Sequence, residues 1–278
     1  MNPTLILCEL GETGLEGQES FSPFCLKAHR ALRAAGLPYE RRHGRSPDAF
    51  REWNPAGQVP VLLVDGAPIA DSTRILARIE TLGGRSLLAR DPRERAEQLL
   101  WEELADTALN GFLVASRWAD ERNWPLVRAA YFAGMPAVVR AFVPAMVRRR
   151  VMESLVARDV WRLGAESCWE RFSLLLDQLE TRAPREGFWT GDCLSVADIA
   201  IFAQLHALRT PLTAPQRSAV AERTVLSAWL DRTDRATRSA SDDGGDRLGE
   251  RRDVARRDRA ERDAEARLER NDERVALS

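Results

Sequence analysis

The chain has 278 residues, with 41 Lys and Arg against 42 Asp and Glu, and hydrophobic residues make up 44% of it. The formal net charge of −1 gives no overall attraction for nucleic acid or an anionic membrane, while the hydrophobic fraction allows a sizeable core in two ordinary domains. The four cysteines and three histidines show neither a Cys-x-x-Cys pair nor metal-ligand spacing, which argues against a disulfide framework and a metal site.

The N-terminal part of the chain predicts a β-α-β unit. MNPTLILCEL has neither the basic region nor the long apolar run of a signal peptide, so we expect a cytoplasmic protein. The apolar run 4–10 predicts a buried strand, and a glycine-rich loop follows it. From Pro23 to Ala35, apolar residues recur at three- and four-residue steps, which predicts a helix. Residues 39–43 can form a second strand.

The next segment predicts a hairpin and a second helix. Residues 59–70 are two apolar runs joined at Asp65-Gly66, a strong signal for a β-hairpin. Residues 71–84 predict a helix with Ser72 as its cap and Gly83 as its stop. Together, residues 1–83 form a complete unit with a small mixed sheet and two helices.

Helical periodicity dominates the rest of the folded chain. We expect a linker at 84–93, with Asp91-Pro92 opening the next helix, and an all-helical domain at 94–237. Ser195 and Asp198 have the spacing of a capping box, which predicts a core helix with a well-specified start.

The segment YFAGMPAVVRAFVPAMV (131–147) is the most apolar of the chain. It is interrupted by Arg140 and carries two prolines, so it falls short of the roughly 20 unbroken apolar residues that a membrane span needs. We interpret it as a buried helix or helix pair. The alternative is surface contact with a membrane through the arginines at 148–150.

The tail, 238–278, has a different composition. Of its last 40 residues 22 are charged and none is aromatic, so it cannot bury enough apolar surface to fold alone. We expect it to be disordered or to form a single solvated helix held by charge pairs three and four residues apart.

Ser22 and Cys25 are the first candidates for chemistry. Ser22 followed by Pro23 is typical of a helix start, where free N–H groups and the positive dipole end also favour a bound anion such as a thiolate. Cys25 falls in the first turn, but its place in the apolar repeat predicts burial and inertness. From these residues alone, the capping role of Ser22 is favoured over a catalytic one.

Two further loop ends carry candidate binding residues. A proline that opens a strand after Val59 belongs at a sheet edge or a special turn, and a cis bond there would expose the Val59 backbone to a ligand. Asp71 and Ser72 form another helix start, offering amides and a hydroxyl to a carboxylate and an acidic side chain to an amine.

The succession SPFCLK, AGLPYE, NPAGQVP, IADSTRI and GDCLSVADIAIF resembles the soluble glutathione S-transferase superfamily over residues 4–237. The SPFCLK and AGLPYE motifs, with the long segment around 131–151, are also similar to the metaxin and failed-axon-connections branch. The resemblance implies an α/β thioredoxin-like N-terminal domain that binds glutathione. It also implies an all-α C-terminal domain over an apolar pocket.

The resemblance also implies roles for particular residues. Ser22 matches the serine that activates the thiol, and Val59 and Pro60 match the residue that pairs with the cysteinyl part of glutathione and the cis-proline after it. Asp71 and Ser72 match the pair that holds the γ-glutamyl amine and carboxylate. Gln58 stands where relatives often carry a polar or basic residue towards the glycine carboxylate.

The resemblance therefore implies a detoxification activity, the conjugation of the glutathione thiolate to small, electrophilic, largely apolar substrates. Glutathione is the co-substrate, and no permanently bound cofactor is expected. We expect a homodimer without nucleic-acid or membrane association. Two alternatives stay open: a non-catalytic, metaxin-like binding or assembly protein, and a thiol transferase that uses Cys25.

Overall fold

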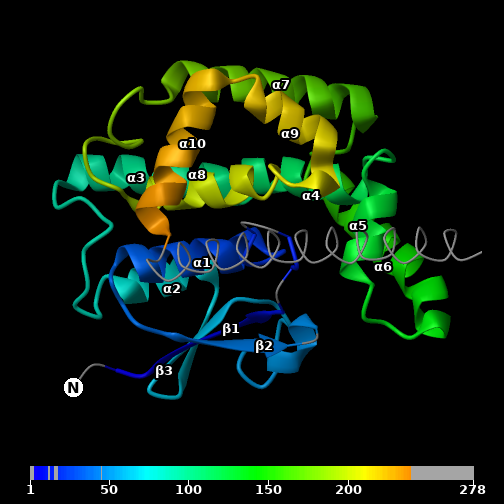
Figure 1. Cartoon of the computed structure of the whole chain (residues 1–278), viewed down its shortest axis with the longest axis horizontal. Helices are drawn as coiled ribbons and strands as arrows, with labels where there is room; N and C mark the ends of the chain where they lie inside the picture. Colours follow the sequence, from blue (N-terminus) through cyan, green and yellow to red (C-terminus); the bar gives the residue numbers. More distant parts are fainter. Residues whose placement is uncertain (1–2, 12, 16–17, 45, 239–278) are drawn as a thin grey trace, which may run out of the picture. The chain divides into compact units, whose positions relative to one another are not determined.

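The computed structural model describes residues 3–11, 13–15, 18–44 and 46–238 (Figure 1). The predicted state of the tail lies outside the described residues, apart from Arg238 at its start. The described residues up to Thr237 form one compact unit, in which the N-terminal helices lie between a sheet and a helical layer (Figure 1).

The N-terminal part forms the predicted mixed sheet with two helices. Its elements in chain order are β1 (Leu5–Leu10), α1 (Pro23–Ala34), β2 (Glu40–Gly44), the 3-10 turn η1 (Pro47–Phe50), β3 (Val61–Val64), β4 (Ala67–Ala70) and α2 (Ser72–Ile79). The strand order is β2-β1-β3-β4, with β1 parallel to β2 and antiparallel to β3. This is the arrangement of a thioredoxin-like domain, as the sequence predicted.

The β3–β4 hairpin shows how the local sequence determines the sheet. Asp65 and Gly66 both have positive φ, 51° and 84°, which a two-residue hairpin turn of this kind requires. The turn fixes the register, pairing Leu62 with Ile69. On the other side of β3, Leu62 pairs with Leu7 of β1, and both side chains are fully buried.

The C-terminal part is helical, as predicted. Its elements are α3 (Pro92–Leu104), the π-helical turn η2 (Ala105–Leu109), α4 (Asn110–Trp118), α5 (Trp124–Tyr131), α6 (Ala137–Ala157), α7 (Gly164–Arg182), α8 (Val196–His206), the 3-10 turn η3 (Pro211–Thr213), α9 (Ala214–Ala221) and α10 (Thr224–Thr237). The turn η2 joins α3 to α4 without a break, so these three elements form one long irregular helix.

Helix α8 is the centre of this domain, and its predicted capping box is confirmed. The Asp198 carboxylate accepts hydrogen bonds from the Ser195 amide and hydroxyl, at 3.0 and 2.8 Å. It also accepts from the Trp189 amide at 2.6 Å and the Trp229 indole at 3.0 Å. Every residue of α8 up to Leu205 is buried, and α1 of the first domain packs against it.

The second helix differs from its prediction at both ends. Its cap is Asp71, whose carboxylate accepts from the Arg74 amide at 3.2 Å, while Ser72 is the first helical residue. A carboxylate accepts hydrogen bonds from the free amides at a helix start as well as a hydroxyl does. Asp71 and Ser72 can therefore both serve as the helix cap. The helix ends at Ile79, and Gly83 follows a further irregular turn with φ of 83°.

The interpretation of residues 131–147 as buried is wrong. Most of this segment belongs to α6, where residues 137–142 are all exposed and only Pro144 and Leu155 of the whole helix are buried. The first turns of α6 extend beyond the bundle (Figure 1), and the helix carries arginines at 140 and 148–150. Among the described residues, no helix is long and apolar enough to cross a membrane.

Candidate functional site

Ser22 caps α1, as predicted. It has extended backbone angles, its hydroxyl oxygen accepts from the Cys25 amide at 3.3 Å, and its side chain is half-buried. The Ser22 amide is itself held by the Ser20 hydroxyl at 3.2 Å, and Arg117 of α4 donates to the Phe21 carbonyl at 2.6 Å. The backbone around the serine is therefore held from both sides.

Cys25 is fully buried, as its place in the apolar repeat predicted. Burial raises the pKa of its thiol to about 12, and the nearby Glu9 charge raises it further against the hydrogen bonds from Ser22 and Ser20. A thiol of this pKa carries almost no thiolate at neutral pH. The arrangement therefore disfavours Cys25 as a nucleophile.

A cavity of about 500 Å³ brings together five of the six residues to which the resemblance gives a role, and Ser22 is not among the residues that line it. These are Gln58, Val59, Pro60, Asp71 and Ser72. The Val59–Pro60 peptide bond is cis, as the resemblance implied. The α1 residue that lines this cavity is Phe24, two positions after Ser22, so the cavity lies against the same helix start.

The start of α2 forms one wall of this cavity. Asp71 has φ of 83°, a conformation that is costly for a residue with a side chain and is typical of functional sites. The Ser72 side chain is 5% exposed, whereas Asp71 is exposed. The N–H groups of the first turn of α2 have no carbonyl partner within the helix, and the positive end of the helix dipole lies at the same place.

The opposite wall comes from the helical domain and was not predicted. Glu103 and Asp106 line the cavity, and Asp106 lies in the π-helical turn. Lys27, the only lysine of the chain, is fully buried and donates to Asp106 at 2.5 Å and to Glu102 at 2.6 Å. Burial raises the Asp106 pKa although Lys27 opposes this, and the second Asp106 oxygen has no hydrogen-bond partner among the described residues.

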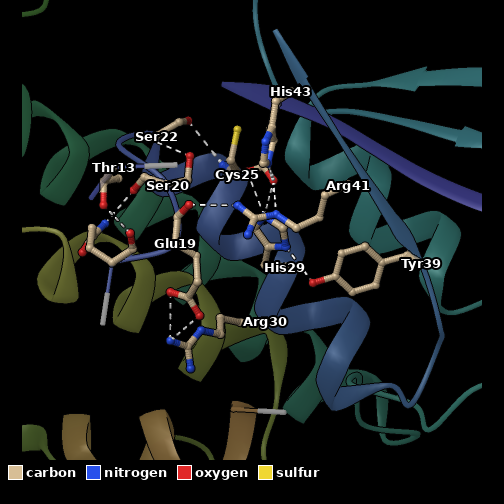
Figure 2. A network of polar contacts seen from close by, with 12 residues as sticks. Thr13, Glu19, Ser20, Ser22, Cys25, His29, Arg30, Tyr39, Arg41 and His43 are labelled. Atoms are coloured by element: carbon tan, nitrogen blue, oxygen red, sulfur yellow. Dashed lines mark hydrogen bonds and ion pairs between the residues drawn. The ribbon is translucent and has the colours of Figure 1, made fainter. Parts of the chain in front are cut away.

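A network of charged and polar side chains connects α1 to β1 and β2 (Figure 2). Glu9 of β1 is fully buried, and His29 Nε2 lies 2.8 Å from both its carboxylate oxygens. The other ring nitrogen of His29 is 2.6 Å from the Tyr39 hydroxyl, and Arg41 donates to Glu9 at 2.6 Å.

The pKa values in this network follow from burial and pairing. Burial lowers the pKa of His29, so the neutral ring donates to Glu9 and accepts from Tyr39. Burial by itself raises the pKa of Glu9, but the hydrogen bonds and charges of His29 and Arg41 outweigh burial, so the carboxyl pKa is lowered. The sequence gives no signal for this network, because its members lie on different elements with no common spacing.

The loop before α1 is tied to the same helix. Glu19 accepts from Arg30 at 2.9 Å and from Arg33 at 2.8 Å, and its backbone carbonyl accepts from Arg41 at 3.0 Å. Figure 2 shows Ser20, Ser22 and Cys25 gathered at the helix start, with Glu19 and Arg30 beside them. Partly buried ion pairs therefore connect the residues just before Ser22 to α1.

Comparison with known proteins agrees with this architecture. Residues 21–82 match the glutathione S-transferase N-terminal domain, and residues 136–232 match the C-terminal domain. The glutathione transferase GST 23 of Zea mays is 35% identical over 98 residues, 33% of this chain and 44% of that protein. Protein LigF of Sphingobium sp. (strain NBRC 103272 / SYK-6) is 25% identical over 237 residues, 77% of this chain and 87% of that protein. The matched region thus spans less than half of the maize relative.

Solved structures share the fold at low identity. Rice GST1 in complex with glutathione has a TM-score of 0.54 and 18% identity, covering 90% of this chain and 96% of that one. FzlA from C. crescentus has a TM-score of 0.52 and 21% identity, covering 82% and 86%. A thioredoxin-like domain joined to an all-helical domain defines the glutathione transferase fold. The chain belongs to the soluble glutathione S-transferase superfamily.

Proposed function

We propose that the protein is a glutathione S-transferase that conjugates the glutathione thiolate to small, electrophilic, largely apolar compounds. The observation that carries the proposal is the cavity that joins Val59 and Pro60 to Asp71 and Ser72 beside the α1 start. A soluble cytoplasmic homodimer, typical of the family, is part of the proposal.

The charges of the cavity suit the γ-glutamyl end of glutathione, which carries an ammonium and a carboxylate on one carbon. Ser72 and the first amides of α2 bind the carboxylate. The ammonium lies between Asp71 and Asp106, whose unpartnered oxygen is buried at this wall. The Val59 backbone pairs with the cysteinyl part, and Gln58 lies towards the glycine carboxylate.

Ser22 then acts on the thiol. Its hydroxyl donates to the sulfur while the α1 dipole stabilises the negative charge, so the thiol loses its proton to solvent at a lower pH than in water. The thiolate forms the new carbon–sulfur bond, and the leaving group departs with its electron pair. The hydroxyl contributes only while the sulfur is anionic, so its removal lowers the rate more than the affinity.

Binding and conjugation assays test the proposal. We expect glutathione to bind the parent protein in calorimetry and to react with 1-chloro-2,4-dinitrobenzene in its presence. Ser22→Ala should lower kcat/KM by about 100-fold and leave glutathione affinity within about threefold. Ser46→Ala is the matched control, because Ser46 also precedes a helical turn but makes no capping hydrogen bond.

The outcomes separate the alternatives. Binding without conjugation would favour the metaxin-like, non-catalytic function. Equal conjugation rates for Ser22→Ala and the parent would contradict the proposed activation. A thiol-transferase activity that disappears in Cys25→Ser but survives in Ser22→Ala would favour the third function, against the full burial of that thiol.

A further inference from the structure

Residues 122–152, called here the α5–α6 segment, have an unusual charge. The segment contains six arginines and no Asp or Glu, although the whole chain has a formal net charge of −1. A stretch of 31 residues with only positive charges therefore lies within a nearly neutral protein. Its cations are the side chains at positions 122, 128, 140 and 148–150.

The same segment exposes large apolar side chains. Val138, Phe142 and Met146 are 77%, 73% and 61% exposed, and they follow one another at four-residue steps on α6. Side chains four residues apart lie on one face of a helix, so the three form a continuous apolar stripe. The stripe leads towards Arg149 and Arg150, which the helical period places at its C-terminal end.

The first turns of α6 project from the bundle. All residues from 137 to 142 are exposed, on every side of the helix, whereas Pro144 and Leu155 further along are buried. Figure 1 shows α6 leaving the helical layer at the end occupied by α5. The described residues leave the apolar stripe of this tip uncovered.

Three of the six arginines have no side-chain partner among the described residues. Arg148 donates to Glu121 and to the Trp118 carbonyl, and Arg149 pairs with Glu153. The side chains of Arg128, Arg140 and Arg150 make no hydrogen bond or ion pair to another described residue, and all three residues are exposed. Their charges are therefore available to an external anion.

We propose that the α5–α6 segment docks on an anionic phospholipid surface. The apolar tip enters the headgroup and acyl boundary, and the arginines at the base of the stripe contact lipid phosphates. Exposed apolar side chains next to unpaired cations match the acyl boundary and the phosphate layer of an anionic bilayer. The proposal is independent of the glutathione site, and it develops the alternative that the arginines at 148–150 contact a membrane surface.

Co-sedimentation of the full chain with vesicles tests the apolar part. We expect binding to vesicles of equal phosphatidylcholine and phosphatidylglycerol, and at least tenfold weaker binding to phosphatidylcholine alone. Phe142→Asp should weaken binding to the anionic vesicles about tenfold or more, because it removes a large apolar group from the buried surface. Leu174→Asp is the matched control, since Leu174 is a 56% exposed leucine on α7.

The charge part has its own pair of variants. The double variant Arg140→Gln with Arg150→Gln should lose about tenfold in affinity and part of the salt dependence. The control double variant, Arg90→Gln with Arg185→Gln, removes the same net charge from exposed positions elsewhere and should bind like the parent. The tryptophan fluorescence of a Phe142→Trp variant should be quenched by brominated acyl chains. Unfolding midpoints equal to that of the parent show that each variant is folded.

Specific outcomes would overturn the proposal. These are no binding to anionic vesicles, equal binding to neutral ones, or equal loss in the Phe142→Asp and Leu174→Asp variants. A change in sedimentation coefficient of the lipid-free protein in Phe142→Asp, without vesicle binding by the parent, would instead identify a second copy of the chain as the occupant. Capture of an acidic protein by a parent that ignores vesicles would identify a protein partner.

Discussion

The starts of α1 and α2 follow the same local pattern but have different surroundings. Ser22 and Asp71 each cap their helix by accepting from the amide three residues later, at 3.3 and 3.2 Å. Beneath α1, however, lies the buried network of Glu9 and His29, whereas α2 begins at an exposed residue with φ of 83°. A sequence pattern therefore specifies the cap, and the packing around it decides what the cap can do.

The residues around the α1 start position Ser22, whereas those around the α2 start are placed to bind a ligand. Side chains that anchor α1 are paired with other protein groups, so their loss affects stability and the placement of Ser22. The groups at α2 and on the facing wall, such as Asp106 with its unpartnered oxygen, face a cavity. Loss of the α2 groups should affect ligand affinity and leave most of the stability intact, whereas loss of Asp106 should affect both, because Asp106 also pairs with the buried Lys27.

The largest expected effect is on stability, from Glu9→Gln. The substitution removes the fully buried anion that contacts both His29 and Arg41, so the free energy of unfolding should fall by about 3 kcal/mol. Urea denaturation followed by circular dichroism measures this. In the control, Asp48→Asn, an exposed pair with Arg51 is lost and we expect less than about 0.5 kcal/mol. Similar losses in both variants would mean that burial does not strengthen the Glu9 contacts.

The second prediction concerns Asp106. If its free oxygen receives the ligand ammonium, Asp106→Asn should weaken glutathione binding about tenfold. A glutathione analogue without the γ-glutamyl amine should bind the parent about tenfold more weakly, but bind parent and variant equally. Calorimetry completes this cycle, and Glu103→Gln, an exposed residue of the same wall, is the control. Additive losses for variant and analogue would exclude the contact.

Two apolar helices show how far the sequence predicted the fold. Both α8 and α6 are rich in apolar residues, and both were interpreted as buried. The interpretation is confirmed for α8, where a capping box fixes the start and the helical residues from 196 to 205 contain one charge, Asp198, satisfied internally. It is wrong for α6, whose arginines cannot be buried without partners. The number and pairing of charges distinguish the two better than apolar content does.

The candidate site was predicted only where it depends on local sequence. The Ser22 cap, the cis-proline and the loop ends are visible as short motifs, and the structure brings five of the six residues into one cavity. The acidic wall is not visible, because the π-helical turn that directs Asp106 has no sequence signature and Lys27 lies 79 residues away. The single lysine in the chain was the one available signal.

The third prediction is a pH dependence of stability. The pKa of His29 and that of Glu9 are both lowered in the folded state. The unfolded chain therefore binds more protons at each group, so the stability they provide is lost as pH falls, from His29 below about pH 6.5 and from Glu9 below about pH 4.5. Each proton contributes at most about 1.4 kcal/mol per pH unit. Urea denaturation at pH 7.5, 6 and 5 should show a decline that is smaller in His29→Gln.

The smallest effect is expected at Asp71, where two costs oppose each other. Asp71→Asn keeps the capping oxygen and a side chain that tolerates positive φ, so stability should change by less than about 0.5 kcal/mol. Asp71→Ala loses the cap and keeps the strain, which should cost about 1 kcal/mol. Asp71→Gly loses the cap but relieves the strain, so it should be more stable than the alanine variant. Thermal unfolding of the three variants gives the order, and an alanine variant as stable as glycine would mean that φ at Asp71 is not strained in solution.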